Sequence, residues 1–213
     1  MPNVLAAGFA RLLVLAALAT ACADMRIQDP AILEHTDQLA PAPEREVFGV
    51  PDEVWFYERP GVEWSRYGSI VVEAPVLLPP PERSDSLSAE DRIELLQRFD
   101  AELRRVLGTR FRLVDAAQAD SLRLRAAITD VQPQRPWLNW VTLVLIVPLS
   151  LGGISGELEV LDAATGERLL AMRAARDGTP FHVLEAFTRF GHAAHGMTKW
   201  ARELLVTMTP PVP

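Results

Sequence analysis

Apolar residues recur at helical spacing in two segments, 87–108 and 180–208. The first has Ser88 at the N-cap position, acidic residues in its first turn and Gly108 after its last turn, which are residue types that begin and end helices. Its apolar stripe comprises Ile93, Leu96, Phe99, Leu103, Val106 and Leu107. The second stripe comprises Val183, Phe187, Phe190, Ala194, Met197, Ala201, Leu204 and Met208. The spacing predicts two amphipathic helices, and two glycines within the second permit close packing or a bend.

Apolar and polar residues alternate with period two in the predicted strands. In 121–131, Leu122 and Leu124 fall on one face and Arg123 and Arg125 on the other. The predicted strands lie in 68–80, 110–115, 121–131 and the two arms of a hairpin over 156–175. This order favours an α+β fold, in which a mixed or antiparallel sheet of about five strands packs two main helices on one face.

One stretch, 137–156, contains no charged residue and no histidine. It is long enough for a membrane span, but Asn139, Pro148 and the terminal "GGISG" interrupt it. Three interpretations stay open: an apolar insertion, 137–154, that is buried in the domain or covered by a partner, a segment dipping into lipid, and a true span. The residues expected to contact a partner or a membrane are Trp137, Trp140, Val144 and Ile146.

The first 21 residues have the parts of an export signal. Arg11 precedes a short apolar core at 12–18, and small residues follow. The core is too short to span a bilayer comfortably, so we interpret 1–21 as a signal peptide.

Cys22 follows this signal directly and is the only cysteine of the chain. The sequence "ATAC" resembles the bacterial lipoprotein signal, in which the cysteine is diacylated and becomes the new N-terminus. A single cysteine cannot form an internal disulfide, and lipidation gives it a role. The alternative is a thiol within a signal removed by an ordinary peptidase. Ala23 stands where the inner-membrane retention signal of enteric-type bacteria has Asp, which favours the outer membrane.

Residues 22–53 are rich in Pro, Ala and charge, without a sustained period. We expect a lipidated flexible tether there, because such a segment has little apolar surface to offset its ordering entropy. A single α+β domain over 54–208 is expected to follow.

The formal charge of the 213-residue chain is -7, and it contains a single lysine, Lys199. Binding to nucleic acid is not expected, because neutralising phosphates needs clustered Lys and Arg. The hydrophobic content of 49% is that of a globular protein.

Three quoted segments carry a family resemblance. "YERPGVEWSRYGSIVVEAPVLL", "AAITDV" and "GGISGELEVLDAATGERL", followed by "RDG", together resemble the uncharacterised bacterial lipoprotein family called domain of unknown function 3313. The resemblance covers about 55–200. It implies an exported lipoprotein and assigns no catalytic residue.

Acidic residues of the hairpin are the first candidates for chemistry. Glu157, Glu159 and Asp162 are interpreted as lying opposite the apolar face, where two carboxylates lining a cleft could act as general acid and base. Solvated carboxylates are the alternative. A third interpretation is structural, with these acids pairing across the sheet with Arg110, Arg112, Arg123 and Arg125.

Metal-capable residues also recur on the last helix. His192 and His195 lie three apart and Glu185 lies seven before His192. Arg189 and Lys199 stand close by, and cations disfavour a metal, so we interpret this as a solvated helix face. No metal, cofactor or catalytic residue is assigned.

Two classes of function follow. The first is a non-enzymatic binding or structural component of the cell envelope, anchored in the outer membrane by the lipid on Cys22, with its domain facing the periplasm and an envelope protein as partner. The second is a periplasmic hydrolase or small-ligand binder that uses the acidic sheet face. A membrane-inserted component through 137–154 is a minor alternative.

Overall fold

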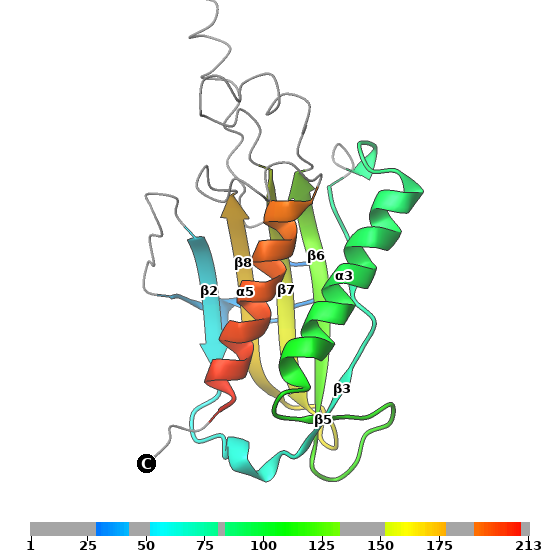
Figure 1. The fold of residues 1–213 in the computed structure, drawn as a ribbon. Coiled ribbons are helices and arrows are strands. Elements are labelled where there is room, and N and C mark those ends of the chain that lie inside the picture. Colours follow the sequence, from blue (N-terminus) through cyan, green and yellow to red (C-terminus); the bar gives the residue numbers. More distant parts are fainter. Residues whose placement is uncertain (1–28, 43–51, 81–83, 133–151, 178–189, 210–213) are drawn as a thin grey trace, which may run out of the picture.

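The computed structural model describes residues 29–42, 52–80, 84–132, 152–177 and 190–209. In these ranges two helices, α3 and α5, lie side by side on one face of an eight-stranded sheet (Figure 1). The strands are β1 (Ala40–Pro41), β2 (Asp52–Glu58), β3 (Ser69–Val72), β4 (Val76–Leu77), β5 (Arg112–Leu113), β6 (Ser121–Gln132), β7 (Gly153–Asp162) and β8 (Arg168–Asp177). The helices are α3 (Ala89–Leu107) and α5 (Gly191–Thr207), and two 3-10 turns are η1 (Thr36–Gln38) and η2 (Trp64–Arg66).

The strand order is β1-β2-β8-β7-β6-β3-β5, and β4 pairs with β6 beyond the end of β3. The pairs β1-β2, β2-β8, β8-β7 and β7-β6 are antiparallel. The pairs β6-β3, β6-β4 and β3-β5 are parallel. The sheet is therefore mixed, and the predicted α+β architecture with two helices on one face is confirmed.

The predicted number of about five strands is wrong, because β1, β2 and β4 were not expected. In β2, Val54 and Phe56 alternate with Trp55 and Tyr57, so both faces carry apolar side chains and the alternation of apolar with polar residues is absent. Pro75 separates β4 from β3, as expected for a residue that cannot donate to a ladder.

Helix α3 begins at the predicted cap. Ser88 accepts a hydrogen bond from the Asp91 backbone amide, and the Asp91 side chain accepts one from the Ser88 amide, which makes a capping box. Its buried stripe differs from the predicted one at its start, because Leu95 is fully buried and Ile93 is 55% exposed. Counting back four residues from buried Phe99 reaches Leu95, so the helical period places Ile93 on the outer face.

Helix α5 crosses β7 through two glycines, one on each element. A Cβ atom at Gly196 would lie 2.7 Å from Ile154 Cγ2, and one at Gly156 would lie 2.9 Å from Trp200 Cζ3. The helix glycines were predicted to permit either close packing or a bend, and Gly196 permits close packing. The second helix was predicted to begin near 180, but α5 begins at Gly191, because its N-cap Phe190 has non-helical backbone angles, φ -128° and ψ 22°. Residues 178–189 lie outside the described ranges.

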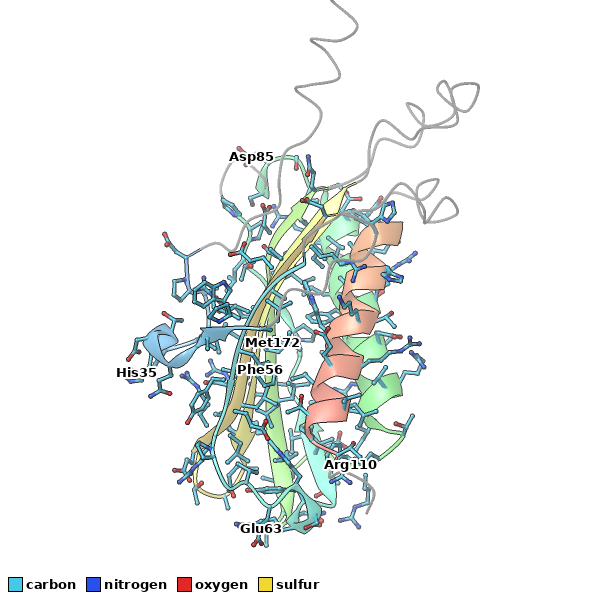
Figure 2. The ribbon with its side chains drawn as sticks, turned by 90° about the vertical axis from the view of Figure 1, so that its left-hand side faces the viewer. His35, Phe56, Glu63, Asp85, Arg110 and Met172 are labelled. Atoms are coloured by element: carbon cyan, nitrogen blue, oxygen red, sulfur yellow. The ribbon has the colours of Figure 1, made fainter. Side chains whose placement is uncertain are left out.

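Residues 29–39, which precede β1, lie on the sheet face opposite the helices (Figure 2). Leu33 and Leu39 are buried there against Ala171 of β8. These residues belong to the range predicted as a tether, so that range includes a part that packs on the sheet. The anchoring contacts come from β7 and β8, more than a hundred residues away, and the local composition carries no sign of them.

Several predicted features lie outside the described residues: the signal peptide, Cys22, and the contact residues Trp137, Trp140, Val144 and Ile146. Among the residues that the structure describes, no helix has the length and apolar character needed to cross a membrane.

Candidate functional site

The acids of β7 do not share one face of the sheet. Glu157 and Glu159 point away from the helices, because Leu158 between them packs in the helix-side core. Asp162 pairs opposite Leu122, at the start of the hairpin turn. The predicted acidic triad is therefore a pair of glutamates and a separate aspartate.

Glu157 is only 1% exposed, so the interpretation of solvated carboxylates is wrong for this residue. Its Oε2 accepts the backbone N–H groups of Ala31, Ile32 and Leu33 at 3.0, 2.8 and 3.1 Å. Its Oε1 lies 3.1 Å from Arg173 Nε on β8. Glu157 thereby pins the N-terminal segment to the sheet.

Glu159 is held between two arginines. Arg125 Nη1 on β6 donates to Oε2 at 3.0 Å, and Arg168 Nε on β8 donates to Oε1 at 2.7 Å. Glu159 is 3% exposed, so this carboxylate is also buried rather than solvated. The predicted cross-strand pairing with Arg125 is confirmed.

Asp162 closes the hairpin turn. Its Oδ1 accepts the backbone N–H groups of Ala164 and Thr165, and its Oδ2 accepts the Tyr67 hydroxyl at 2.8 Å. Burial alone would raise the pKa of Asp162, but the hydrogen bonds from Thr165, Tyr67 and Ala164 outweigh it and hold that pKa below its ordinary value. Burial and the bond to Asp162 raise the pKa of Tyr67 to about 12.

The other predicted arginines have other partners. Arg123 lies 3.6 Å from Glu73, Arg112 donates to Gln118, and Arg110 donates to the Trp64 carbonyl. Pairing of these three with the acids of β7 is therefore wrong. Sequence reasoning missed two partners, Arg168 and Arg173. Both lie in the second arm of the hairpin, where they face Leu161 and Glu157, and this position was the available signal that they could pair with the acids of β7.

A polar pocket of about 550 Å³ opens on the face that carries Glu159, between the strands and the N-terminal segment. Its lining residues are Ile32, Glu34, His35, Gln38, Tyr57, Arg59, Arg125, Glu159, Leu161, Gly166, Glu167 and Arg168. Arg59 and Glu167 form an ion pair at its rim. His35, labelled at the far left of Figure 2, has left-handed backbone angles, φ 55° and ψ 58°. Such angles are uncommon outside glycine and recur at ligand-binding positions.

A second concavity, of about 630 Å³, lies on the helix side between β1, β2 and α5. Val54, Phe56 and Val206 give this apolar groove its character, and Lys199 and Arg202 stand at its edge. The sequence did not predict it, because β1 and β2 were not recognised.

Two of the three metal-capable residues considered from the sequence, His192 and His195, lie on α5. His192 is 5% exposed, which corrects the expectation of a solvated face there. Glu185 lies outside the described residues, and within them no cluster of three metal-capable side chains occurs.

The fold and its two concavities define a two-layer α+β domain with a covered sheet face, a class that by itself names no activity. The chain belongs to the family described as protein of unknown function (DUF3313), whose family model matches residues 44–204. The predicted resemblance is thereby confirmed.

Solved structures give weaker similarities. The PelC dodecamer from Paraburkholderia phytofirmans has 12% identity and a TM-score of 0.42, over 70% of this chain and 93% of that one. A Xanthomonas campestris protein of the DUF330 family has 10% identity and a TM-score of 0.35, over 70% and 90%. No curated protein matches the sequence. At these levels of likeness no role passes to any residue of this chain.

Proposed function

We propose that this chain is a lipoprotein of the bacterial outer membrane, whose α+β domain faces the periplasm and binds another envelope component without catalysing a reaction. The anchor is the diacylated Cys22 that the sequence predicts. Each buried methylene of an acyl chain contributes about 0.8 kcal/mol, so several chains hold a protein firmly on a membrane.

The engagement of the three acids of β7 carries the non-enzymatic part of the proposal. A general acid or base needs a carboxyl oxygen within reach of the substrate. Oε2 of Glu157 accepts backbone amides and its Oε1 lies within ion-pair distance of Arg173, while both oxygens of Glu159 accept hydrogen bonds from arginines. Asp162 is likewise bonded through both oxygens. A hydrolase using this face would have to break these contacts, whereas a binding domain keeps them.

The small-ligand alternative has one observation in its favour, the polar pocket beside Glu159. It requires no chemistry from the carboxylates and is compatible with a binding role.

The experiment is expression of the full chain and its Cys22→Ala variant in a Gram-negative host with labelled palmitate. The wild type should incorporate label and sediment with the outer membrane, and Cys22→Ala should do neither. Because the chain has no other cysteine, loss of label in this variant assigns the site without ambiguity. Membrane retention with label in Cys22→Ala would overturn the anchor.

Crosslinking in the same cells tests the binding role. A defined envelope protein should be captured by the wild type and less so by the released Cys22→Ala variant. A turnover activity that is abolished by Glu159→Gln, with the fold intact, would overturn the non-enzymatic proposal.

A further inference from the structure

We propose that the polar pocket is a saccharide site, which takes one or two polyhydroxylated rings without a net charge. This goes beyond the proposed envelope role and does not depend on the lipid anchor, since every lining residue comes after Cys22, in the packed N-terminal segment or in the sheet. The volume of about 550 Å³ falls in the range of small-molecule sites.

The wall of the pocket is fixed before any ligand arrives. Glu157 holds the three amides of Ala31, Ile32 and Leu33, and Leu33 is buried in its own small core. The next residues along the chain, Glu34 and His35, are exposed and line the pocket. A preformed wall spares the ligand the ordering cost that a loose loop would impose.

The charges of the lining balance. Three arginines, Arg59, Arg125 and Arg168, stand with three glutamates, Glu34, Glu159 and Glu167. Arg125 and Arg168 share Glu159, and Arg59 pairs with Glu167. An anionic ligand would compete with these carboxylates for the arginines. A cationic ligand would compete with the arginines for the carboxylates. A neutral ligand inserts without displacing a charge, so the balance favours it.

Ion-paired side chains suit hydroxyl groups in particular. A guanidinium offers several fixed N–H donors, a carboxylate has four acceptor positions, and one sugar hydroxyl can donate and accept at once. A hydrogen bond to a charged partner is stronger than a bond between neutral groups. Tyr57, half-buried beside Ile32, supplies ring surface for the apolar face of a sugar. Donors, acceptors and one aromatic ring together define a saccharide site.

The test uses the full exported chain, labelled with ¹⁵N and purified in an amine-oxide detergent, because glycosidic detergents would occupy the site. Glucose, galactose, N-acetylglucosamine and their disaccharides are titrated to millimolar concentrations while amide shifts are followed. We expect at least one sugar to shift amides of 32–38 and 159–168 with saturation. Inorganic phosphate, acetate and tetramethylammonium should not do so.

Two variants locate the binding. Arg125→Gln should weaken the sugar about tenfold or more, the loss of one charge-assisted hydrogen bond. Arg123→Gln is the matched control, because Arg123 lies on the same face of the same strand, is equally exposed, pairs with Glu73 and does not line the pocket. Gln38→Ala, at an exposed rim position, should also weaken binding and keeps the proposal testable if Arg125→Gln unfolds.

Saturating shifts from the phosphate or ammonium probe and not from any sugar would overturn the proposal, as would no shift from the sugars, or equal weakening by Arg123→Gln. The Cys22→Ala variant should bind sugar as the wild type does. Failure of the lipid anchor and failure of the sugar site are thereby distinguishable.

Discussion

Gly196 of α5 lies against Ile154 of β7 so closely that no side chain fits between them. One turn later Trp200 lies over Gly156 in the same way, with 2.9 Å between its ring and a Cβ atom built at that glycine. Helix and strand thus approach each other through one glycine from each, which brings Trp200 into the centre of the core.

Replacing Gly196 by alanine is therefore expected to destabilise the domain. In an exposed helix this change stabilises by about 1 kcal/mol, because alanine has the higher helix propensity. Here the new methyl group meets Ile154, and overpacking of this kind costs about 1 to 3 kcal/mol. Thermal unfolding should show a lower Tm for Gly196→Ala. Val206→Ala, at a 73% exposed position of the same helix, is the control and should change the Tm little. A higher Tm for Gly196→Ala would mean that α5 can move away from β7 without a loss of stability, and would contradict this prediction.

The close approach illustrates what periodicity can and cannot predict. The stripe of α5 with Met197, Ala201 and Leu204 follows from spacing, and so do the cap at Ser88 and the hairpin turn, because each depends on neighbours within a few residues. β2 was not predicted because both of its faces are apolar. The contact of Gly196 with Ile154 was not predicted either, because Ile154 lies about forty residues earlier in the chain.

The candidate site was less predictable than the fold for the same physical reason. Alternation correctly placed Arg125 and Glu159 on one face, and their pairing follows from strand neighbourhood. The burial of Glu157 depends on the backbone amides of 31–33, which are apolar residues in a Pro-rich segment and carry no sign of that contact.

Glu157→Ala should release the N-terminal segment from the sheet. The change removes the acceptor of three amides and leaves Arg173, whose side chain is 13% exposed, without its carboxylate. Breaking a buried ion pair typically destabilises by about 3 to 5 kcal/mol. We expect a loss of that order in urea unfolding. Amide hydrogen exchange at 31–33 should also speed up more than exchange in the core of β6 and β7.

Glu53→Ala is the comparison for this variant, because Glu53 is an exposed carboxylate on β2, which β8 separates from β7. It should leave both measurements close to the wild type. Equal exchange rates at 31–33 in wild type and Glu157→Ala would contradict the anchoring role.

Tyr67 should make the domain sensitive to high pH. Its folded pKa of about 12 exceeds the ordinary value of 10.0, so between these values the folded chain holds a proton that the unfolded chain has lost. Stability contributed by this proton is fully present below pH 10.0 and falls as the pH rises toward 12. Tyr67→Phe removes the ionisable group, and the difference in unfolding free energy between wild type and variant should shrink across this window.

Absorbance titration checks the same point directly, because the chain has two tyrosines. The late-ionising tyrosinate signal should disappear in Tyr67→Phe and persist in Tyr57→Phe. A late signal that survives in Tyr67→Phe would assign the raised pKa to another group.

Ala23→Asp should redirect the protein from the outer to the inner membrane of an enteric-type host. In such bacteria the inner-membrane retention signal has Asp directly after the lipidated cysteine. This chain has Ala23 at that position and Asp24 at the next one. The change leaves Cys22 in place, so palmitate incorporation should be the same as in the wild type. Density-gradient separation of the two membranes gives the measurement, and Ala23→Ser, which adds no charge, is the control. If the wild type already bands with the inner membrane, Asp24 acts as the retention signal and the proposed outer-membrane location is wrong.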